Sequence, residues 1–548
     1  MVVGAHEATI GREASSLREM WSAPEAASPQ ARAAPALSAR RAYPILSPAP
    51  GVAETDPEEW IDALSAAWQD VRAQIAGAGV APELVSIGLS GQMHGFVPIG
   101  RDGRAVHRAI TWADERGAEF APLYAAALGD EFGRLLNAPA AGLTALTLLW
   151  MKYRAPELYR DTAKILFPKD YLRYRLTGEL GTDPGDASAS LLWDFSVHGW
   201  SERALEALGL DKSKLPPLLD SFGVGGAVCR TGARDTGLPE GVPVAVGSAD
   251  KACEIYGSGF FSEYFERAMA AESGAGAIPV ASPAGTVRAP DADWMSPRIA
   301  QVSIGTGIQV VIPTRSVPPY ASGLNLFETC VPGLRYRMAA MLNGGLALEW
   351  VRSTLSSHRT WAEFYAEFED GPAGLKQKPV DLPRDLFFLP YLSGERSPYQ
   401  NPKARGAWIG LGLHHTTRDM LSSALLGVAC TIRLGLDTLG VAPDAHVYCV
   451  GGSTRFAPWM HIVSAMTGRK LSISDEPDAS VRGAAEIGLT ATRYGRFMPG
   501  IMPAALKTTA LESPRAEWMN DYFDQFLKYY EALFGQTRSS DTLISPSD

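Results

Sequence analysis

The sequence predicts an α/β protein in which a strand, a glycine-rich turn and a helix recur in both halves of the chain. Short apolar runs at residues 84–89, 243–246 and 447–450 predict buried strands, and glycines follow each run closely. The chain of 548 residues is longer than one hydrophobic core usually requires, so we expect two large domains. This recurrence is compatible with a duplicated α/β domain.

The first predicted helix begins with a capping box, in which Thr55 precedes Glu58 by three residues and Pro57 lies in the first turn. Apolar side chains then recur at helical spacing as far as residue 75. The same patterns predict the later elements, which are two strands at 299–312 joined by a tight turn, a helix over 456–466 and a last helix over 517–534.

Composition and motif order divide the chain into four segments. Residues 1–42 are rich in Ala, Ser and Arg and lack a convincing strand, so we expect them to be poorly ordered or not native to the fold. Residues 43–249 are expected to form the first domain, residues 250–505 the second, and residues 506–548 a C-terminal helix and tail. Residues 261–298 have no clean periodicity and predict a loop or insertion.

The composition excludes several classes of protein. The net charge of −10 argues against a nucleic-acid partner, which needs clustered Lys and Arg. The five cysteines are scattered and form no CxxC pair, so we expect reduced thiols in a cytoplasmic protein and no disulfide framework or zinc site. No apolar run is long enough to predict a membrane span. His414 and His415 lack a partner at metal-ligand spacing, so we expect a surface turn and no metal ligands.

Asp250 is the first candidate for catalysis, because it directly follows the strand at 243–246 and its glycine turn. A carboxylate there can serve as a general base in phosphoryl transfer, because the loose transition state of that reaction does not need a strong base. The alternative is a helix N-cap, a role for which Asp is among the preferred residues.

Residues 90–95 follow the strand at 84–89 and hold Gln92, Met93 and His94 between two glycines. The amide and the imidazole can hydrogen-bond hydroxyl groups, and Met packs against carbon, so this run suits a small polyhydroxylated ligand. Asp114 follows another short strand, and its carboxylate would either accept hydrogen bonds from such a ligand or cap the next helix.

Two glycine turns are candidates for nucleotide binding, because glycine lets the backbone approach a phosphate or an adenine ring closely. Neither turn is specific alone, and the chain contains no Gly-Lys dipeptide, which excludes a Walker A loop. The residues concerned are Gly305, Thr306 and Gly307 in the first turn and Gly451, Gly452 and Ser453 in the second.

The order of these motifs resembles the FGGY family of carbohydrate kinases, and most closely its xylulokinases. The matching runs are residues 90–95, 110–114, 168–172, 182–188, 247–251, 303–307, 389–396 and 450–453. The resemblance implies two actin-like (ribonuclease H-like) domains with the active site in the interdomain cleft, and ATP with Mg²⁺ as cosubstrates. A homodimer follows from the resemblance alone.

Carried over by position, the resemblance makes Asp250 the base and makes Met93 and His94 sugar contacts. It places residues 305–307 near the transferred phosphate and residues 451–453 along the adenosine pocket. Three departures are evident in the sequence, and one is that residues 261–298 are longer than the family's usual connection. The Asp-Leu-Gly-Thr-Ser-type hairpin with which the family opens is not found in residues 1–42, and Lys251 stands where an amide usually follows the base.

The resemblance therefore predicts ATP-dependent phosphorylation of a ketose, with D-xylulose as the expected substrate and D-xylulose 5-phosphate as the product. Lys251, a point charge in place of an amide, leaves open a kinase of another ketose or of a polyol, unless its side chain faces solvent. A chain without the N-terminal hairpin would alternatively be a non-catalytic sugar- or nucleotide-binding homologue.

Overall fold

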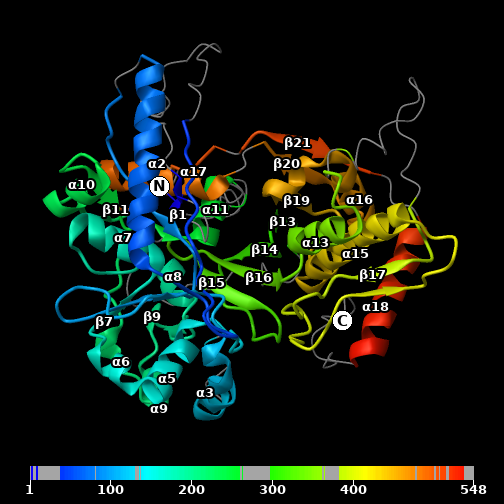
Figure 1. The fold of residues 1–548 in the computed structure, drawn as a ribbon, viewed down its shortest axis with the longest axis horizontal. Coiled ribbons are helices and arrows are strands. Elements are labelled where there is room, and N and C mark those ends of the chain that lie inside the picture. The colour runs from blue at the N-terminus through cyan, green and yellow to red at the C-terminus, as the bar shows by residue number, and fades with distance from the viewer. Residues whose placement is uncertain are drawn as a thin grey trace, which may run out of the picture. The chain divides into compact units, whose positions relative to one another are not determined.

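The computed structural model describes most of the chain, and the chain divides into two compact units (Figure 1). The N-terminal unit comprises Met1–Ser262, Phe327–Leu334 and Asp478–Ala505, and the C-terminal unit comprises Glu263–Leu326, Arg335–Pro477 and Leu506–Asp548. The described residues are 2–3, 8–9, 37–79, 82–129, 135, 137–259, 262, 264, 297–360, 363, 382–475, 478–498, 501–504, 506–513 and 517–535. The predicted insertion at 261–298 lies almost entirely outside them.

The N-terminal unit combines short strands with helices around two clusters of buried hydrophobic residues. Its helices are α2 (Pro57–Gly77), η1 (Arg116–Phe120), α3 (Ala121–Leu128), α5 (Thr144–Arg154), α6 (Pro156–Asp161), α7 (Pro168–Thr177), α8 (Pro184–Ser188), α9 (Glu202–Leu208), η3 (Lys212–Lys214), α10 (Arg230–Thr236), α11 (Asp250–Gly257) and α17 (Ala479–Tyr494). Its strands are β1 (Val2–Val3), β2 (Ala8–Thr9), β3 (Glu54–Thr55), β4 (Ser90–Gly91), β5 (Val97–Ile99), β6 (Ala109–Ile110), β7 (Lys164–Leu166), β8 (Trp193–Asp194), β9 (Gly199–Trp200), β10 (Val224–Ala227), β11 (Pro243–Ala245) and β12 (Ser248–Ala249).

The predicted helix and strand near the start of this unit are present with shifted boundaries. The N-cap of α2 is Asp56, whose side chain accepts a hydrogen bond from the Glu58 amide, and not Thr55 as the capping box predicted. The strand expected over 84–89 is observed as a bridge between Ile87 and Val244, followed by β4, which extends two residues beyond the predicted end. The predicted helix and strand are therefore both present, and only their boundaries differ from the prediction, by a few residues.

The N-terminal segment corrects the expectation that residues 1–42 contain no strand. β1 and β2 pair antiparallel, and β1 lies parallel beside β4, which gives a sheet with the order β12-β4-β1-β2. Two paired strands therefore lie within residues 1–42, and residues 4–7 between them lie outside the described residues. Two-residue strands carry too little alternation to be detected in the sequence.

Residues 37–42 also belong to the packed structure. Ala39 is buried in the same hydrophobic core as Tyr43, and the backbone carbonyl of Ser38 accepts a hydrogen bond from Gln74 of α2. Arg41 forms an ion pair with Asp70 of the same helix. The order expected from residue 43 onward therefore begins several residues earlier.

The structure does not divide the chain at residues 249 and 250. Helix α11, which follows that position, packs closely on α17, and both helices belong to the N-terminal unit. A Cβ added at Gly257 would lie 2.0 Å from the Ala479 carbonyl oxygen, and one at Gly483 would lie 1.9 Å from that of Cys253. Glycines on both helices thus allow the two backbones to approach, a tertiary contact that the local sequence does not reveal.

The C-terminal unit is built on a seven-stranded sheet with the order β15-β16-β14-β13-β19-β20-β21. Its strands are β13 (Ile299–Ile304), β14 (Ile308–Thr314), β15 (Asn325–Glu328), β16 (Arg335–Met341), β17 (Phe387–Leu389), β18 (Ala407–Ile409), β19 (His446–Val450), β20 (Leu471–Ser474) and β21 (Thr508–Leu511). Its helices are α13 (Gly345–Leu355), α15 (Thr417–Thr438), η4 (Gly452–Arg455), α16 (Ala457–Thr467) and α18 (Trp518–Phe534). The strand pair at 299–312, the strand at 447–450 and the last helix confirm the predictions for this half.

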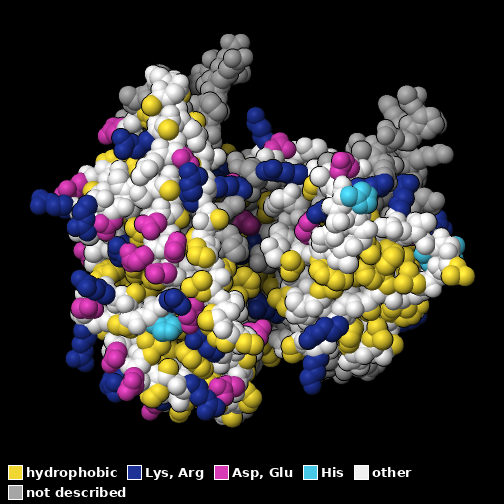
Figure 2. Space-filling model, viewed as in Figure 1, with side chains coloured by type: hydrophobic (Ala, Val, Ile, Leu, Met, Phe, Trp, Pro, Cys, Tyr) yellow, Lys and Arg dark blue, Asp and Glu magenta, His cyan; other side chains and the backbone are white. Residues whose placement is uncertain are grey.

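Helix α15 lies against the sheet and forms the centre of this unit's core (Figure 1). It is the one helix among the described residues that is long and apolar enough to cross a bilayer, and 83% of its most apolar window is buried inside the protein. Burial of this kind is typical of a core helix. The exposed large hydrophobic residues of this unit include Leu346, Trp350, Leu411 and Leu413. Apolar side chains also gather on the visible face of the same unit, whereas charged side chains of both signs intersperse on the N-terminal unit (Figure 2).

Candidate active site

The first part of the candidate site lies where β4 and β12 end, in the N-terminal unit. The two strands are parallel, with Ser248 opposite Ser90 and Ala249 opposite Gly91. The residues that come next, Asp250 and Gln92, therefore leave the sheet at the same edge. Ligands of open α/β sheets bind at such carboxyl ends.

Gly247 makes this arrangement possible. Its φ of +76° is a left-handed conformation that favours glycine, and an added Cβ would lie 2.1 Å from the Leu89 carbonyl oxygen. A side chain at this position would therefore push β12 away from the chain that precedes β4.

Asp250 is the first residue of α11 and does not act as its N-cap, a position that Ala249 holds without a side-chain hydrogen bond. Its Oδ1 accepts a hydrogen bond of 2.6 Å from the Lys251 amide. Burial raises the pKa of Asp250 to about 6, and the nearby Glu254 adds to the rise, whereas the charge and amide of Lys251 oppose it. A carboxyl group with such a pKa is ionised at neutral pH and is a stronger base than an ordinary Asp.

Lys251 does not face solvent, because its side chain is 6% exposed. Its Nζ donates to Glu254 Oε1 over 2.6 Å within the same helix. The second alternative for this residue, a solvent-facing Lys, is thus excluded, and a charge pair stands beside Asp250.

The Gln92–Met93–His94 run supplies two groups with unusual surroundings. Oε1 of Gln92 is buried and has no hydrogen-bond partner among the described residues. His94 has a φ of +74°, which is rare for a residue with a side chain. Its Nδ1 lies 2.9 Å from the Ala189 carbonyl oxygen, which can only accept, so Nδ1 carries the proton and Nε2 of the neutral ring is an acceptor. Met93 is buried beside them.

Asp114 is placed differently from the other sugar-contact candidates. It is fully buried, and its carboxylate accepts hydrogen bonds from the Ala53 amide and from the amide and guanidinium of Arg116. Arg116 also binds Glu54 at 2.7 Å. Because both oxygens of Asp114 are occupied, these contacts favour the capping alternative over a contact with a ligand.

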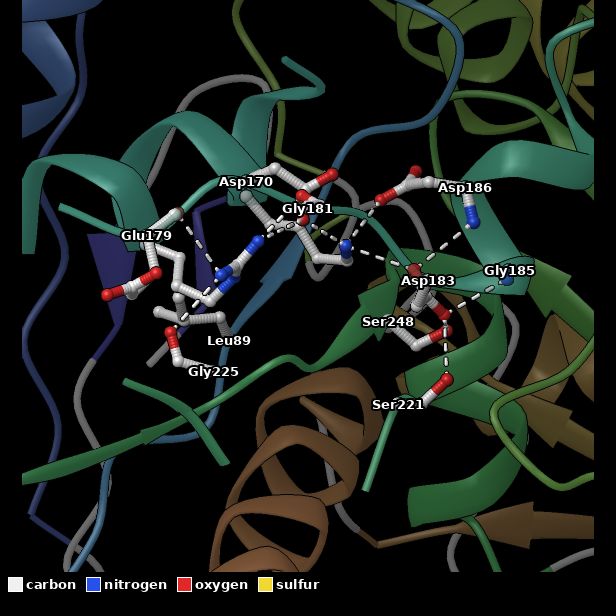
Figure 3. Close-up of polar contacts among 12 residues, drawn as sticks. Leu89, Asp170, Glu179, Gly181, Asp183, Gly185, Asp186, Ser221, Gly225 and Ser248 are labelled. Carbon is white, nitrogen blue, oxygen red and sulfur yellow. Dashed lines mark hydrogen bonds and ion pairs between the residues drawn. The ribbon is translucent and has the colours of Figure 1, made fainter. Parts of the chain in front are cut away.

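A buried polar network supports this part of the site (Figure 3). Lys169 Nζ lies 2.7 Å from Asp170, 3.0 Å from Asp183 and 3.1 Å from Asp186, and all four side chains are fully buried. Arg173 lies 3.8 Å from Asp170 and donates to backbone carbonyls, at 2.6 Å in the nearest case. The sequence presented these residues only as parts of matching runs, and nothing in their spacing revealed the network.

The network holds more acidic than basic groups, so the carboxylates repel one another and their charged forms are disfavoured. Burial raises the pKa of Asp186 well above its usual value, and the neighbouring Asp183 and Asp170 add to the rise while Lys169 opposes it. The pKa of Asp170 is raised for the same first reason. Such a buried cluster is stable only while its ammonium group is in place.

The second part of the candidate site lies in the C-terminal unit, where both predicted glycine turns come together. β13 and β19 are parallel neighbours, and they run into residues 305–307 and 451–453 respectively. Gly451 has a φ of +105°, and a Cβ there would lie 2.6 Å from the Ile304 carbonyl oxygen. The turns predicted separately therefore form one edge of the sheet.

The N-terminus of α13 braces the first turn. The amides of Gly344 and Leu346 donate to the Thr306 carbonyl at 3.0 and 3.1 Å, and the Gly345 amide donates to that of Gly305 at 2.8 Å. No local pattern in the sequence indicates this support, because α13 follows the turn by almost forty residues.

The glycines of these turns differ in what a side chain would meet. A Cβ at Gly305 or Gly452 would meet nothing within 4 Å, whereas one at Gly307 would lie 2.7 Å from the Met341 carbonyl oxygen. Gly305, Thr306 and Gly452 are exposed. This open backbone surface fits a ligand that approaches closely, as the phosphates or the adenine of ATP would.

His414 and His415 lie close to Asp385 in space, a contact that the sequence did not predict. Asp385 lies 3.3 Å from Nε2 of His414 and 3.2 Å from Nε2 of His415, and the three ligand atoms lie within 4.8 Å of one another. The Gly412 amide, however, donates to Nδ1 of His415, so the proton of the neutral ring is on Nε2. A metal needs that nitrogen free, and the contacts therefore favour a hydrogen-bonded turn.

Comparison with protein families matches these two units to two known domains. Residues 32–257 match the N-terminal domain of the FGGY family of carbohydrate kinases, and residues 300–492 match its C-terminal domain. The chain therefore belongs to the FGGY family and is a carbohydrate kinase.

Similar curated proteins include several xylulose kinases. The chain is 25% identical to that of Staphylococcus epidermidis over 495 residues, which is 89% of this chain and 90% of the relative. It is 27% identical to that of Escherichia coli over 472 residues, or 85% and 86% of the two chains. A crystal structure described as a xyloylose kinase from Brucella ovis is 25% identical, with a TM-score of 0.74 and 97% of both chains covered.

Proposed function

We propose that this carbohydrate kinase transfers a phosphoryl group from ATP to a ketose, most specifically from Mg-ATP to D-xylulose to give D-xylulose 5-phosphate. The similarity to xylulose kinases supports the sugar, and the surroundings of Asp250 support the chemistry. The observation that carries the proposal is an ionised, partly buried carboxylate at the strand edge that also presents Gln92.

In the proposed mechanism, Asp250 takes the proton of the terminal hydroxyl group as that oxygen attacks the γ-phosphorus. The new bond joins the sugar oxygen to phosphorus, the bond to the bridging oxygen breaks, and ADP leaves with that oxygen. A positioned base contributes about 100- to 10,000-fold to the rate in such steps. Mg²⁺ would neutralise charge on the phosphates.

The ligand-facing roles follow from the chemistry of these groups and their place after β4. Gln92 Oε1 and His94 Nε2 would accept hydrogen bonds from sugar hydroxyls, and Met93 would pack against the carbon chain. Residues 305–307 would approach the transferred phosphate, and residues 451–453 would line the adenosine pocket. The five free thiols suit a reducing compartment such as the cytoplasm.

A second candidate substrate is another ketose or a polyol, and the Lys251–Glu254 pair favours it. A buried charge pair beside the base offers a donor and an acceptor where an amide is usual. The non-catalytic alternative remains open: two short strands do lie beside β4, but their residues do not contain the family's phosphate-binding motif.

The test is sugar-dependent ADP release from the purified 548-residue chain, with Mg-ATP, a panel of ketoses and polyols, and Asp250→Asn as the blank. We expect release with D-xylulose above the other sugars and none in the blank. Release with a different sugar would reassign the substrate, and no release with any sugar from folded protein would overturn the proposal.

A further inference from the structure

Strand β12, which leads into Asp250, has little backbone support of its own. It contains only two residues, and it lies at the edge of its sheet, with β4 as its neighbour. An edge strand of this length has few ladder hydrogen bonds to fix its position. Some other contact must hold its free side if Asp250 is to keep a defined place.

The side chain of Asp183 provides that contact (Figure 3). Its Oδ2 accepts a hydrogen bond of 2.5 Å from Ser248 Oγ on β12 and one of 2.9 Å from Ser221 Oγ. The same carboxylate caps α8 through the amides of Gly185 and Asp186. A short hydrogen bond from a hydroxyl group to a carboxylate is stronger than a hydrogen bond between two neutral groups.

Lys169 fixes Asp183 from its other oxygen. The ammonium group lies 3.0 Å from Oδ1 of Asp183 and also binds Asp170 and Asp186, so Asp183 cannot rotate without breaking a buried ion pair. A Cβ at Gly91 would lie 2.9 Å from the Lys169 backbone nitrogen, so α7, the helix that carries Lys169, also packs on β4. The residues that hold β12 thus contact the strand that leads to Gln92.

We propose that Asp183 is a positioning residue for phosphoryl transfer, which acts by holding Ser248 and thereby fixes the carboxylate of Asp250 at the edge of the sheet. This inference rests on the proposed function of Asp250. Asp183 contacts no reacting atom in this scheme; it takes the place of a neighbouring strand. General-base catalysis depends on this placement, since the base must lie within hydrogen-bond reach of its proton.

The chain offers a matched pair of variants. Ser248→Ala and Ser221→Ala each remove one buried hydroxyl from the same oxygen of Asp183, but only Ser248 lies on β12, two residues before Asp250. We expect Ser248→Ala to lower kcat about 10- to 100-fold, because a misplacement of about 1 Å can cost that much. The KM for the sugar should stay within about threefold, and Ser221→Ala should lower kcat far less at a similar loss of melting temperature.

Gly185→Ala perturbs the same contact from the opposite side. Its Cβ would lie 2.3 Å from Ser248 Oγ and 2.8 Å from Asp183 Oδ2, while alanine favours the helical backbone. We expect the kcat of this variant to fall as in Ser248→Ala, and it decides the question if Ser248→Ala does not fold.

The decisive measurement is kcat and sugar KM of the wild type and the three variants, each with its melting temperature. An active wild type with equal kcat losses in the two serine variants, at equal stability, would overturn this inference and leave the proposed function standing. A folded wild type without sugar-dependent ADP release would instead overturn the proposed function, and this inference with it.

Discussion

The two units present their candidate residues by opposite means. In the N-terminal unit, the candidate residues are side chains, and a buried charge network lies around Lys169. In the C-terminal unit, two glycine turns expose bare backbone, which neighbouring backbone amides and carbonyls support. A small sugar is distinguished by the placement of its hydroxyls, whereas polyphosphate is bound through close approach. The difference teaches that variants should change turnover in the first unit and nucleotide affinity in the second.

The largest effect is expected at the side-chain site. Asp250→Asn should lower kcat by at least about 100-fold and leave the KM for the sugar nearly unchanged, because the amide cannot take a proton. ADP release with saturating sugar measures this. Asp62→Asn on the exposed face of α2 is the control and should retain full activity. Turnover retained in Asp250→Asn would show that Asp250 is not the base.

Lys169→Met should destabilise the N-terminal unit by about 3–5 kcal/mol, because it leaves three buried carboxylates without their ammonium partner. Urea unfolding of the purified variant measures the loss. The matched change is Lys164→Met, which removes a single hydrogen bond to the Leu215 carbonyl and should cost about 1 kcal/mol. Equal losses in the two variants would show that the network does not support the site.

The glycine turns should respond in ligand affinity without loss of stability. Gly305→Ala and Gly452→Ala place a methyl group in open space, so the melting temperature should hold while the KM for ATP rises about tenfold, equivalent to about 1.4 kcal/mol. Gly307→Ala and Gly451→Ala instead meet carbonyl oxygens and should lower the melting temperature. An unchanged KM for ATP in the first pair would mean that the open backbone does not face the nucleotide.

The smallest effects concern pH. With the pKa of Asp250 at about 6, kcat/KM should fall as the pH drops through 6 and the base becomes protonated. Lys251→Gln removes a charge that lowers this pKa and should move the acid limb to higher pH, whereas Glu254→Gln should move it to lower pH. Shifts in the same direction would show that the charge pair does not act on the base.

Protonation of Asp250 also changes the stability of the folded state. The folded pKa of Asp250 exceeds the unfolded value near 3.9, so the folded state binds more protons between about pH 4 and pH 6. This group therefore costs stability as the pH rises through that window, and the cost is fully present at neutral pH. Asp250→Asn should accordingly melt at a higher temperature than the wild type at pH 7, and the difference should shrink on acidification.

Local sequence located the candidates that depend on strand ends and turns. Asp250 and both glycine turns stand where the sequence placed them, since a strand followed by a glycine turn is a local pattern. Asp114 resembled a ligand contact because part of its surroundings comes from elsewhere in the chain. Ala53, whose amide donates to Asp114, and Glu54, which binds the same Arg116, precede it by about sixty residues. Asp385 likewise precedes His414, its partner, by 29 residues.

The remaining differences have the same cause. β1 and β2 are two residues each, too short for a period, and they are recognisable only beside β4. The short path from Lys169 to Ser248 depends on α7, α8 and β12 meeting in space, which no spacing in the chain encodes. Tertiary charge networks are therefore the part of a site that sequence patterns describe least.

The glycine contact between α11 and α17 has a consequence for biosynthesis. Gly257 and Gly483 belong to helices that are synthesised far apart in time, because the C-terminal unit is encoded between them. Domains generally fold as they leave the ribosome, but the helix that begins with Asp250 cannot gain its packing partner until α17 has emerged. A chain that is released before α17 has been synthesised would therefore carry Asp250 without the helix that α11 packs on.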